Sequence, residues 1–400
     1  MAQRGSVVRF SKTAFDAALA RAPIDAPARA VGGVAFSLPM PDGSLARFRV
    51  VESPIISAEL AADFSEIRTY AGQGIDDPTA TTRFGWTPAG FHAIVLSHGG
   101  TSFVDPYVQG NLDYYVAFAK ADARRPATPF TCLVDGTSSD SAQRTTSDLP
   151  FSNGTTLRIY RLAVAATGEY TAAAGGTKAL ALSRMVTTMC RVNGIYEREI
   201  AVRLVMSTGT ATDSTALIYT DGTTDPYTND DGSLMLSENQ TNLDGVIGTA
   251  NYDMGHVFST GGGGIAILRS PCSASYKAMG VTSSPNSTGD AYDVDTWRTK
   301  WGTSSAEAIR STAPACPAPE ATDRRRTPLK WAAVQRSRPM PGICNPEDLQ
   351  LHSNDYFHME SLNEITAFLT TSGASCGRGG RGGMSDSGSD VDSAHHANAS

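Results

Sequence analysis

The stretch that decides the fold is Leu157–Met206, which reads LRIYRLAVAA, TGEYTAAAGGT, KALALSRMVTTMCRVNGIYER and EIAVRLVM. Its first ten residues form an apolar run typical of a buried strand. Apolar residues then recur at helical spacing, which predicts a helix over about Lys178–Arg198. The residues with this spacing are Leu182, Met185, Val186 and Met189. Ile200–Met206 predicts the next strand, and alternating strands and helices favour an α/β fold.

The elements downstream continue this pattern. Leu234–Ile247 predicts a helix, and Gly255–Phe258 predicts a short central strand. The glycines at 261–264 predict a loop rather than a phosphate-binding loop, because no Gly-Lys-Ser or Gly-Lys-Thr follows them. Asn345–Leu369 predicts helix again. We therefore expect one α/β domain over residues 156–376, with a disordered tail over 377–400, where core-forming residues are absent.

The first part of the chain has a different pattern of apolar and polar residues. Residues 33–135 alternate apolar and polar side chains in short runs, such as Ala46–Val51 and Gly90–Leu96, which predicts a mainly β domain. Residues 1–32 are expected to be a weakly structured lead-in. Residues 136–155 are rich in Ser, Thr, Asp and Gly, which predicts an exposed linker and a plausible processing site.

Composition narrows the class of protein. The chain has 400 residues, 40% hydrophobic and 18% charged, as expected for a folded protein of two or three domains. Its net charge of -7 argues against general nucleic-acid binding. No apolar run is long enough to span a membrane, so we expect neither nucleic acid nor membrane as a partner. The oligomeric state stays open.

One segment differs in composition and pattern from the sequence on both sides of it. From Trp297 to about Pro341 the chain is rich in Trp, Arg, Pro and Ala and shows no pattern of strands or helices. A composition typical of globular proteins returns at Gly342. Such a segment indicates a shifted reading frame over 297–341. When one base is restored before codon 297, the codons can read Val-Ala-His-Glu-Met-Gly-His-Gln-Phe-Gly-Gly-Ser-His. This hypothetical amino-acid sequence has the pattern H-E-x-x-H-x-x-G-x-x-H, a zinc-binding signature.

The spacing of that pattern has a chemical reason. Histidines at i and i+4 lie on one face of a helix and reach one ion, and a third histidine completes the site. The glutamate acts as general base on a zinc-bound water. In the restored frame the ligands would fall near Thr299, Thr303 and Ile309, and the base near Lys300. The residues as written cannot replace them, so the catalytic, cofactor-binding and metal residues expected for this chain are none.

Several in-frame stretches carry a family resemblance. They are Pro39–Gly43, Arg68–Gly74, Ala165–Thr171, Arg191–Arg198 and Asn251–Thr260. Together they resemble bacterial reprolysin-like zinc metallopeptidases of the metzincin clan. The resemblance implies a metzincin-like twisted sheet with helices, a mainly β pro-region over 33–135, zinc as cofactor and protein or peptide substrates. It also implies an extracellular protein, although Met1–Phe15 has no apolar stretch of the secretory type. The Met-turn of the family, expected before Gly342, is not matched.

Cysteines and histidines leave alternatives open. Cys132 in the pro-region can block the zinc as a thiolate, but a small buried residue is the interpretation we favour. Cys272 or Cys344 can form a disulfide in a secreted protein, and the sequence does not define the pairing. His352 and His358 are potential metal ligands, although a lone helical histidine more often serves a structural role. Stoichiometric zinc would point to these two residues or to His256.

Two functions from different classes remain. The first is a zinc metalloendopeptidase, which the lineage favours, although the chain as written is expected to be inactive and to bind no zinc. The second is a non-catalytic pseudoenzyme, or a remnant that binds peptide in the old cleft, which the literal sequence favours. Substrate specificity and pro-region processing are not readable from the sequence.

Overall fold

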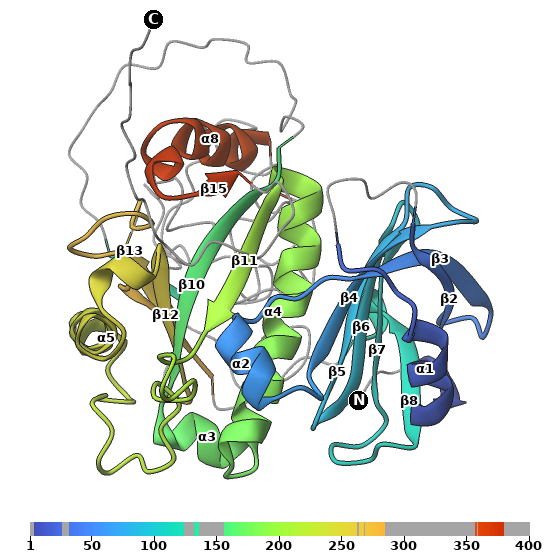
Figure 1. Cartoon of the computed structure of the whole chain (residues 1–400), viewed down its shortest axis with the longest axis horizontal. Coiled ribbons are helices and arrows are strands. Elements are labelled where there is room, and N and C mark those ends of the chain that lie inside the picture. Colours follow the sequence, from blue (N-terminus) through green and yellow to red (C-terminus); the bar gives the residue numbers. More distant parts are fainter. Residues whose placement is uncertain are drawn as a thin grey trace, which may run out of the picture.

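Two β-sheets lie on either side of one long helix, α4 (Lys178–Ile200), in the computed structural model (Figure 1). The structure describes residues 4–25, 32–123, 132–135, 156–261, 264–267, 269–284, 357 and 359–379. The predicted α/β class is confirmed, with a mainly β part preceding a mixed sheet of metzincin-like type. None of the described helices is long and apolar enough to cross a membrane.

The first sheet is an eight-stranded antiparallel meander with strand order β1-β8-β7-β6-β5-β4-β3-β2. Its strands are β1 (Ser6–Arg9), β2 (Val34–Pro39), β3 (Leu45–Glu52), β4 (Arg68–Gly74), β5 (Thr81–Thr87), β6 (Gly90–Ser97), β7 (Gly100–Pro106) and β8 (Tyr114–Ala119). The sheet carries the helices α1 (Lys12–Leu19) and α2 (Ala58–Asp63) and the 3₁₀ turn η1 (Lys120–Asp122). One face buries a cluster of aromatic rings that includes Phe84 and Phe91. We call residues 6–122 the N-terminal β-domain.

The expectation of a weakly structured lead-in over 1–32 is wrong for residues 6–19. Strand β1 pairs with β8 in register Ser6↔Ala117 to Arg9↔Tyr114, which places it at the edge of the sheet. Helix α1 follows and is capped by the hydroxyl of Ser11, and it buries Phe15 and Leu19 against the aromatic cluster. The stabilisation comes from this tertiary contact, because so short a helix is marginal by itself.

The second sheet has the strand order β11-β10-β12-β14-β13-β9, and β15 also pairs with β10. Its strands are β9 (Cys132–Asp135), β10 (Arg158–Ala166), β11 (Val202–Ser207), β12 (Met254–Ser259), β13 (Gly264–Ile267), β14 (Gly280–Ser283) and β15 (Arg378–Gly379). Strands β10, β11, β12 and β14 are parallel, whereas β13 runs antiparallel to β14. We call the described residues within 158–379 the peptidase-like domain, after the family that their sequence resembles.

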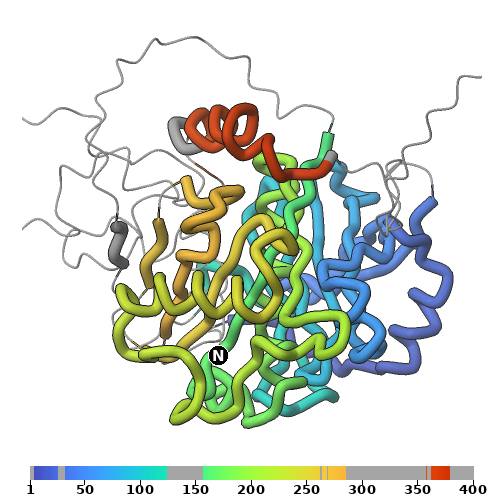
Figure 2. The backbone as a smooth tube through the Cα atoms, turned by 60° about the vertical axis from the view of Figure 1, so that its left-hand side comes forward, coloured from blue at the N-terminus to red at the C-terminus, as the bar shows by residue number. Residues whose placement is uncertain are grey.

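Helices cover this sheet on both faces. Besides α4 they are α3 (Gly168–Ala174), α5 (Gly232–Val246), α8 (Met359–Thr370) and the 3₁₀ turns η2 (Thr249–Asn251) and η4 (Ser372–Ser375). Figure 2 shows α8 across the top of the sheet and α5 beside β12 and β13. The core under α5 includes Met235, Leu243 and Val257. The core under α4 is the larger one, and it continues into the N-terminal β-domain.

Most elements predicted in the peptidase-like domain are confirmed. The predicted strands at Leu157–Ala166, Ile200–Met206 and Gly255–Phe258 correspond to β10, β11 and the central strand β12. The two predicted helices correspond to α4 and α5. Of the helical region expected over 345–369, the described part is α8, and residues 297–341 lie outside the described residues.

The tail departs from expectation at its first residues. Arg378 and Gly379 form β15, which pairs antiparallel with the start of β10. A disulfide between Cys272 and Cys376, with their Cα atoms 5.5 Å apart, holds the chain beside this strand. The prediction of disorder is therefore wrong for residues 377–379, and residues 380–400 lie outside the described residues.

The stretch Arg191–Arg198, which carries part of the family resemblance, contacts both sheets from within α4. Asn193 is fully buried; its amide donates to the carbonyl of Leu204 (2.9 Å) and accepts from the backbone N–H of Leu204 (2.7 Å). Gly194 lies over β5 and β6, where an added Cβ would contact Ile94 at 3.5 Å. One turn of helix thus joins β11 on one side and the first sheet on the other.

Candidate functional site

The outer edge of β13 is the most informative feature of the peptidase-like domain. Strand β13 would end the sheet, but the four-residue strand β9 pairs with it in parallel. The register runs from Gly264↔Cys132 to Ile267↔Asp135. Strand β9 comes from the segment just after the N-terminal β-domain, far from β13 in the sequence. An extended segment of the chain therefore occupies the edge of the sheet, as a bound peptide does in β-augmentation.

Buried polar side chains lie behind this edge, between β12 and β14. The Nε2 atom of His256 is 2.8 Å from the hydroxyl of Thr282, and Ser259 hydrogen-bonds Ser283 across the same pair of strands. A Cβ on Gly280 would come within 2.6 Å of the Nδ1 atom of His256, so the imidazole ring lies tightly against β14. His256 is therefore a hydrogen-bonded core residue.

The carboxyl end of β10 leads into a well-capped turn. Thr167 caps α3 through its hydroxyl, which accepts from the N–H of Tyr170, and the N–H of Gly168 donates to Asp225 (2.6 Å). Asn229 hydrogen-bonds both Thr167 and Thr260. An added Cβ on Gly168 would come within 2.1 Å of the backbone of Gly222, so the loop that follows β11 packs closely on α3. These contacts explain the resemblance stretches Ala165–Thr171 and Asn251–Thr260 as parts of one scaffold.

The residues that the structure describes offer no set of zinc ligands. Among the described residues, no three His, Cys, Asp or Glu side chains lie close enough together to hold a metal. The positions near which the restored frame would place ligands are Thr299, Thr303 and Ile309, and an isoleucine side chain has no donor atom. We therefore derive no catalytic step through zinc for the chain as written.

The structure describes only some of the residues that the sequence analysis named as site candidates. The backbone of Cys132 lies in β9 opposite Gly264, and His256 lies inside the sheet. Thr299, Lys300, Thr303 and Ile309 lie outside the described residues, as do His352 and His358. Cys272 forms a disulfide with Cys376, a pairing that the sequence had left open, and Cys344 lies outside the described residues. The sequence offered no signal for this pairing, because it depends on where α8 and η4 pack.

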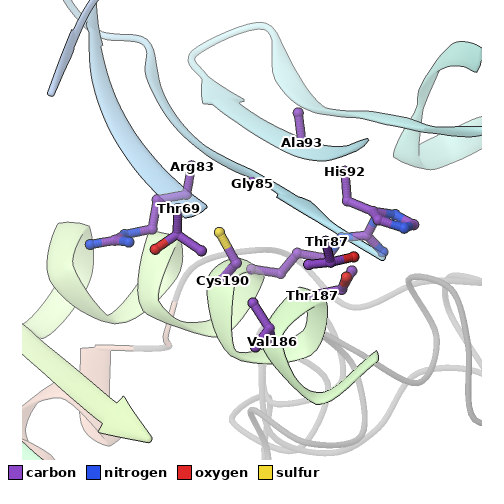
Figure 3. A pocket seen from close by; sticks show the side chains of 10 residues that line it. Thr69, Arg83, Gly85, Thr87, His92, Ala93, Val186, Thr187 and Cys190 are labelled. Atoms are coloured by element: carbon purple, nitrogen blue, oxygen red, sulfur yellow. The ribbon is translucent and has the colours of Figure 1, made fainter. Parts of the chain in front are cut away.

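A small cavity lies where α4 meets the first sheet (Figure 3). It measures about 10 Å³, which is room for the centre of one water molecule. The thiol of Cys190 points from α4 toward Arg83 on β5, and burial raises the pKa of this thiol to about 11. The thiol is therefore protonated and unreactive near neutral pH. We interpret the cavity as a packing feature of the domain interface.

The parallel sheet, its antiparallel edge strand β13 and the long helix α4 define a protein of metzincin-like α/β type. Residues 156–302 match the family described as Metallo-peptidase family M12B Reprolysin-like. This part of the chain is reprolysin-like, and peptidases of this family depend on zinc and act on proteins or peptides. No curated protein matches the sequence.

Proposed function

We propose that the chain derives from a secreted zinc metalloendopeptidase and, as written, binds an extended peptide without cleaving it. The observation that carries this proposal is the pairing of β9 with the edge of β13. This edge can hold an extended segment through backbone hydrogen bonds, and the reprolysin-like match supports peptides as the ligand class. In the intact chain the bound segment is β9 itself, so an added peptide has to compete with it.

The absence of hydrolysis follows from side-chain chemistry. A metallopeptidase needs three imidazoles on one ion and a carboxylate to accept a proton from water. Threonine, isoleucine and lysine stand near those positions in residues 299–309. The frame shift over 297–341 is our explanation for this substitution.

The disulfide supports export of the protein. The bridge between Cys272 and Cys376 joins the sheet to the segment after α8. Structural disulfides persist in oxidising compartments and are rare in the cytosol. We therefore propose an extracellular location, as the family resemblance implies.

Peptide binding is tested by competition with β9. A fluorescent peptide with the sequence of residues 129–138 is titrated into the intact chain and into a variant in which 132–135 reads Gly-Ser-Gly-Ser. Glycine and serine weaken strand pairing, so the variant should bind at least about tenfold more tightly than the intact chain. The matched control is the same peptide with proline at both 133 and 134, which removes the backbone donors that a neighbouring strand needs. Equal affinity for the two peptides would contradict binding along β13.

Hydrolysis is tested by repair of the reading frame. One base is inserted before codon 297 and one is removed near codon 341, and both proteins are assayed on a broad peptide library. The chain as written should cleave nothing, whereas the repaired chain should show cleavage that a chelator blocks. Changing the restored glutamate to glutamine should abolish turnover. Cleavage by the unrepaired chain would refute the proposal, and a repaired, folded, inactive protein would show that catalysis was lost before the frame changed.

A further inference from the structure

We propose that the N-terminal β-domain is a permanent partner of the peptidase-like domain and stays bound to it after the chain is cut between them. A pro-region is expected to leave once residues 136–155 are cleaved. The interface described below has instead the character of a domain core and an obligate subunit contact. This inference is independent of peptide binding and of catalysis.

The two domains share one apolar core. Tightly buried residues from the N-terminal β-domain and from the peptidase-like domain belong to a single continuous cluster. The contribution of the N-terminal β-domain consists of Ile55, Ile56, Leu60, Ile67, Ile94, Leu96, Phe103 and Phe118. They pack against the cluster that α4 and β11 build, which includes Val186, Met189 and Leu204. Separation would expose this apolar surface to water on both halves, which obligate interfaces avoid.

A buried network of charges fixes how the two halves fit together. Arg203 on β11 donates to Asp25 of the N-terminal β-domain (2.5 Å) and to Glu197 on α4 (2.6 Å). Glu197 also pairs with Arg83 on β5, and Arg83 donates to the hydroxyl of Ser53 (2.9 Å). The four charged side chains are at most 8% exposed. Each half supplies one cation and one anion, and the pairs Arg203–Asp25 and Arg83–Glu197 cross the interface, so these two pairs form only when the two halves meet in this orientation.

A second ion pair lies further along the same interface. Arg191 on α4 pairs with Asp105 on β7, and the Nδ1 atom of His92 on β6 is 2.8 Å from the same carboxylate. The guanidinium of Arg191 lies 4.8 Å from the ring centre of Phe103, which adds a cation–π contact. An intact buried charge pair is weak evidence for affinity, whereas removing one partner leaves the other charge buried and unpaired, which is strongly destabilising. We therefore assign affinity to the apolar core and orientation to the two ion-pair groups.

The first half of the chain also covers both open edges of the second sheet. On the β11 edge, the N–H of Met206 donates to the carbonyl of Ile55, and the carbonyl of Met206 accepts from the N–H of Ser57, both at 2.7 Å. On the opposite edge, β9 pairs with β13. Uncovered sheet edges pair with other chains and lead to aggregation. The peptidase-like domain therefore needs the preceding part of the chain to keep both edges closed.

The test cuts the full chain without removing anything. Two copies of a site-specific protease sequence with a flexible spacer replace residues 140–150, and complete cleavage is confirmed on a denaturing gel. The cut protein is diluted to about 100 nM, a concentration at which weak complexes dissociate, and is passed through a gel-filtration column. Both fragments should elute together in the position of the uncut chain. Elution as two separate fragments would overturn the proposal.

Substitutions in the network test what holds the halves in place. Glu197→Gln leaves Arg83 and Arg203 without their shared carboxylate, and Asp25→Asn removes the far anion. Each should raise the dissociation constant of the cut protein at least about tenfold, as measured by dilution on the column. The matched control is Asp76→Asn, which removes an exposed pair with Arg47 inside the N-terminal β-domain and should change nothing.

The circular dichroism of each uncut variant is compared with that of the parent chain before cutting. If Glu197→Gln does not fold, Asp25→Asn provides the comparison, because Asp25 lies outside the helices and strands. Variants that dissociate no more readily than Asp76→Asn would refute the role of the ion network. Dissociation of the parent chain itself would refute the permanent partnership.

Discussion

Reduction of the disulfide between Cys272 and Cys376 should destabilise the peptidase-like domain strongly. The bridge spans a sequence separation of 104 residues and links the loop before β14 to the turn after α8. A crosslink stabilises mainly by lowering the conformational entropy of the unfolded chain, and its effect grows with the length of the closed loop.

The magnitude follows from the loop length. For a loop of about 100 residues, the chain-entropy relation predicts about 4.7 kcal/mol of stabilisation at 25 °C. Residual structure in the unfolded chain lowers this value, so the expected loss of unfolding free energy is about 3–5 kcal/mol. With a urea slope of about 3 kcal/mol/M, the unfolding midpoint should fall by about 1–1.7 M.

The assay is urea unfolding followed by far-ultraviolet circular dichroism, with and without reductant. The parent chain should lose stability on reduction, and Cys376→Ala should start at the low value and be insensitive to reductant. The matched control is Ser375→Ala, an exposed neighbour that leaves the bridge in place. A midpoint that moves by less than about 0.3 M on reduction would refute the entropic argument, because less than about 1 kcal/mol would then come from loop closure.

Three further predictions concern single sites. Asn193→Ala should lower the unfolding free energy by about 2–4 kcal/mol in urea titrations, because it leaves the backbone N–H and carbonyl of Leu204 without their buried partner; a loss below about 1 kcal/mol would contradict this. Burial alone would raise the pKa of Asp105, but Arg191 and then His92 lower it below its ordinary value. The stability from this carboxylate is therefore complete above about pH 4 and lost as pH falls through the lowered pKa, so parent and Asp105→Asn should converge in urea midpoint at low pH; a constant gap between them would contradict the assignment. The dialysed chain should carry no stoichiometric zinc by elemental analysis, and chelator-sensitive zinc at one ion per chain would contradict the side-chain argument.

Local pattern predicted the three strands β10, β11 and β12 because they are largely buried. Strand β10 reads as an apolar run since helices cover both faces, and α4 shows its spacing since one of its stripes faces β11. The stretches that carry the family resemblance were also recognisable from local sequence, since their residues form turns, helix caps and close backbone contacts. The positions of the zinc ligands were predicted only from the hypothesis of a shifted reading frame, and they stay a prediction.

Tertiary structure decided the rest, because it depends on residues far apart in the sequence. Asp25 meets Arg203 at a separation of 178 residues, and Arg83 meets Glu197 at 114, so no local pattern marks them as partners. Strands β1 and β9 are too short to be recognised from alternation, and each exists because a distant strand offers an open edge. The sequence by itself determined the long buried elements, which are β10, β11, β12, α4 and α5. Only packing decided that the first half of the chain closes both edges of the second sheet, since edge pairing is set by proximity and not by side-chain pattern.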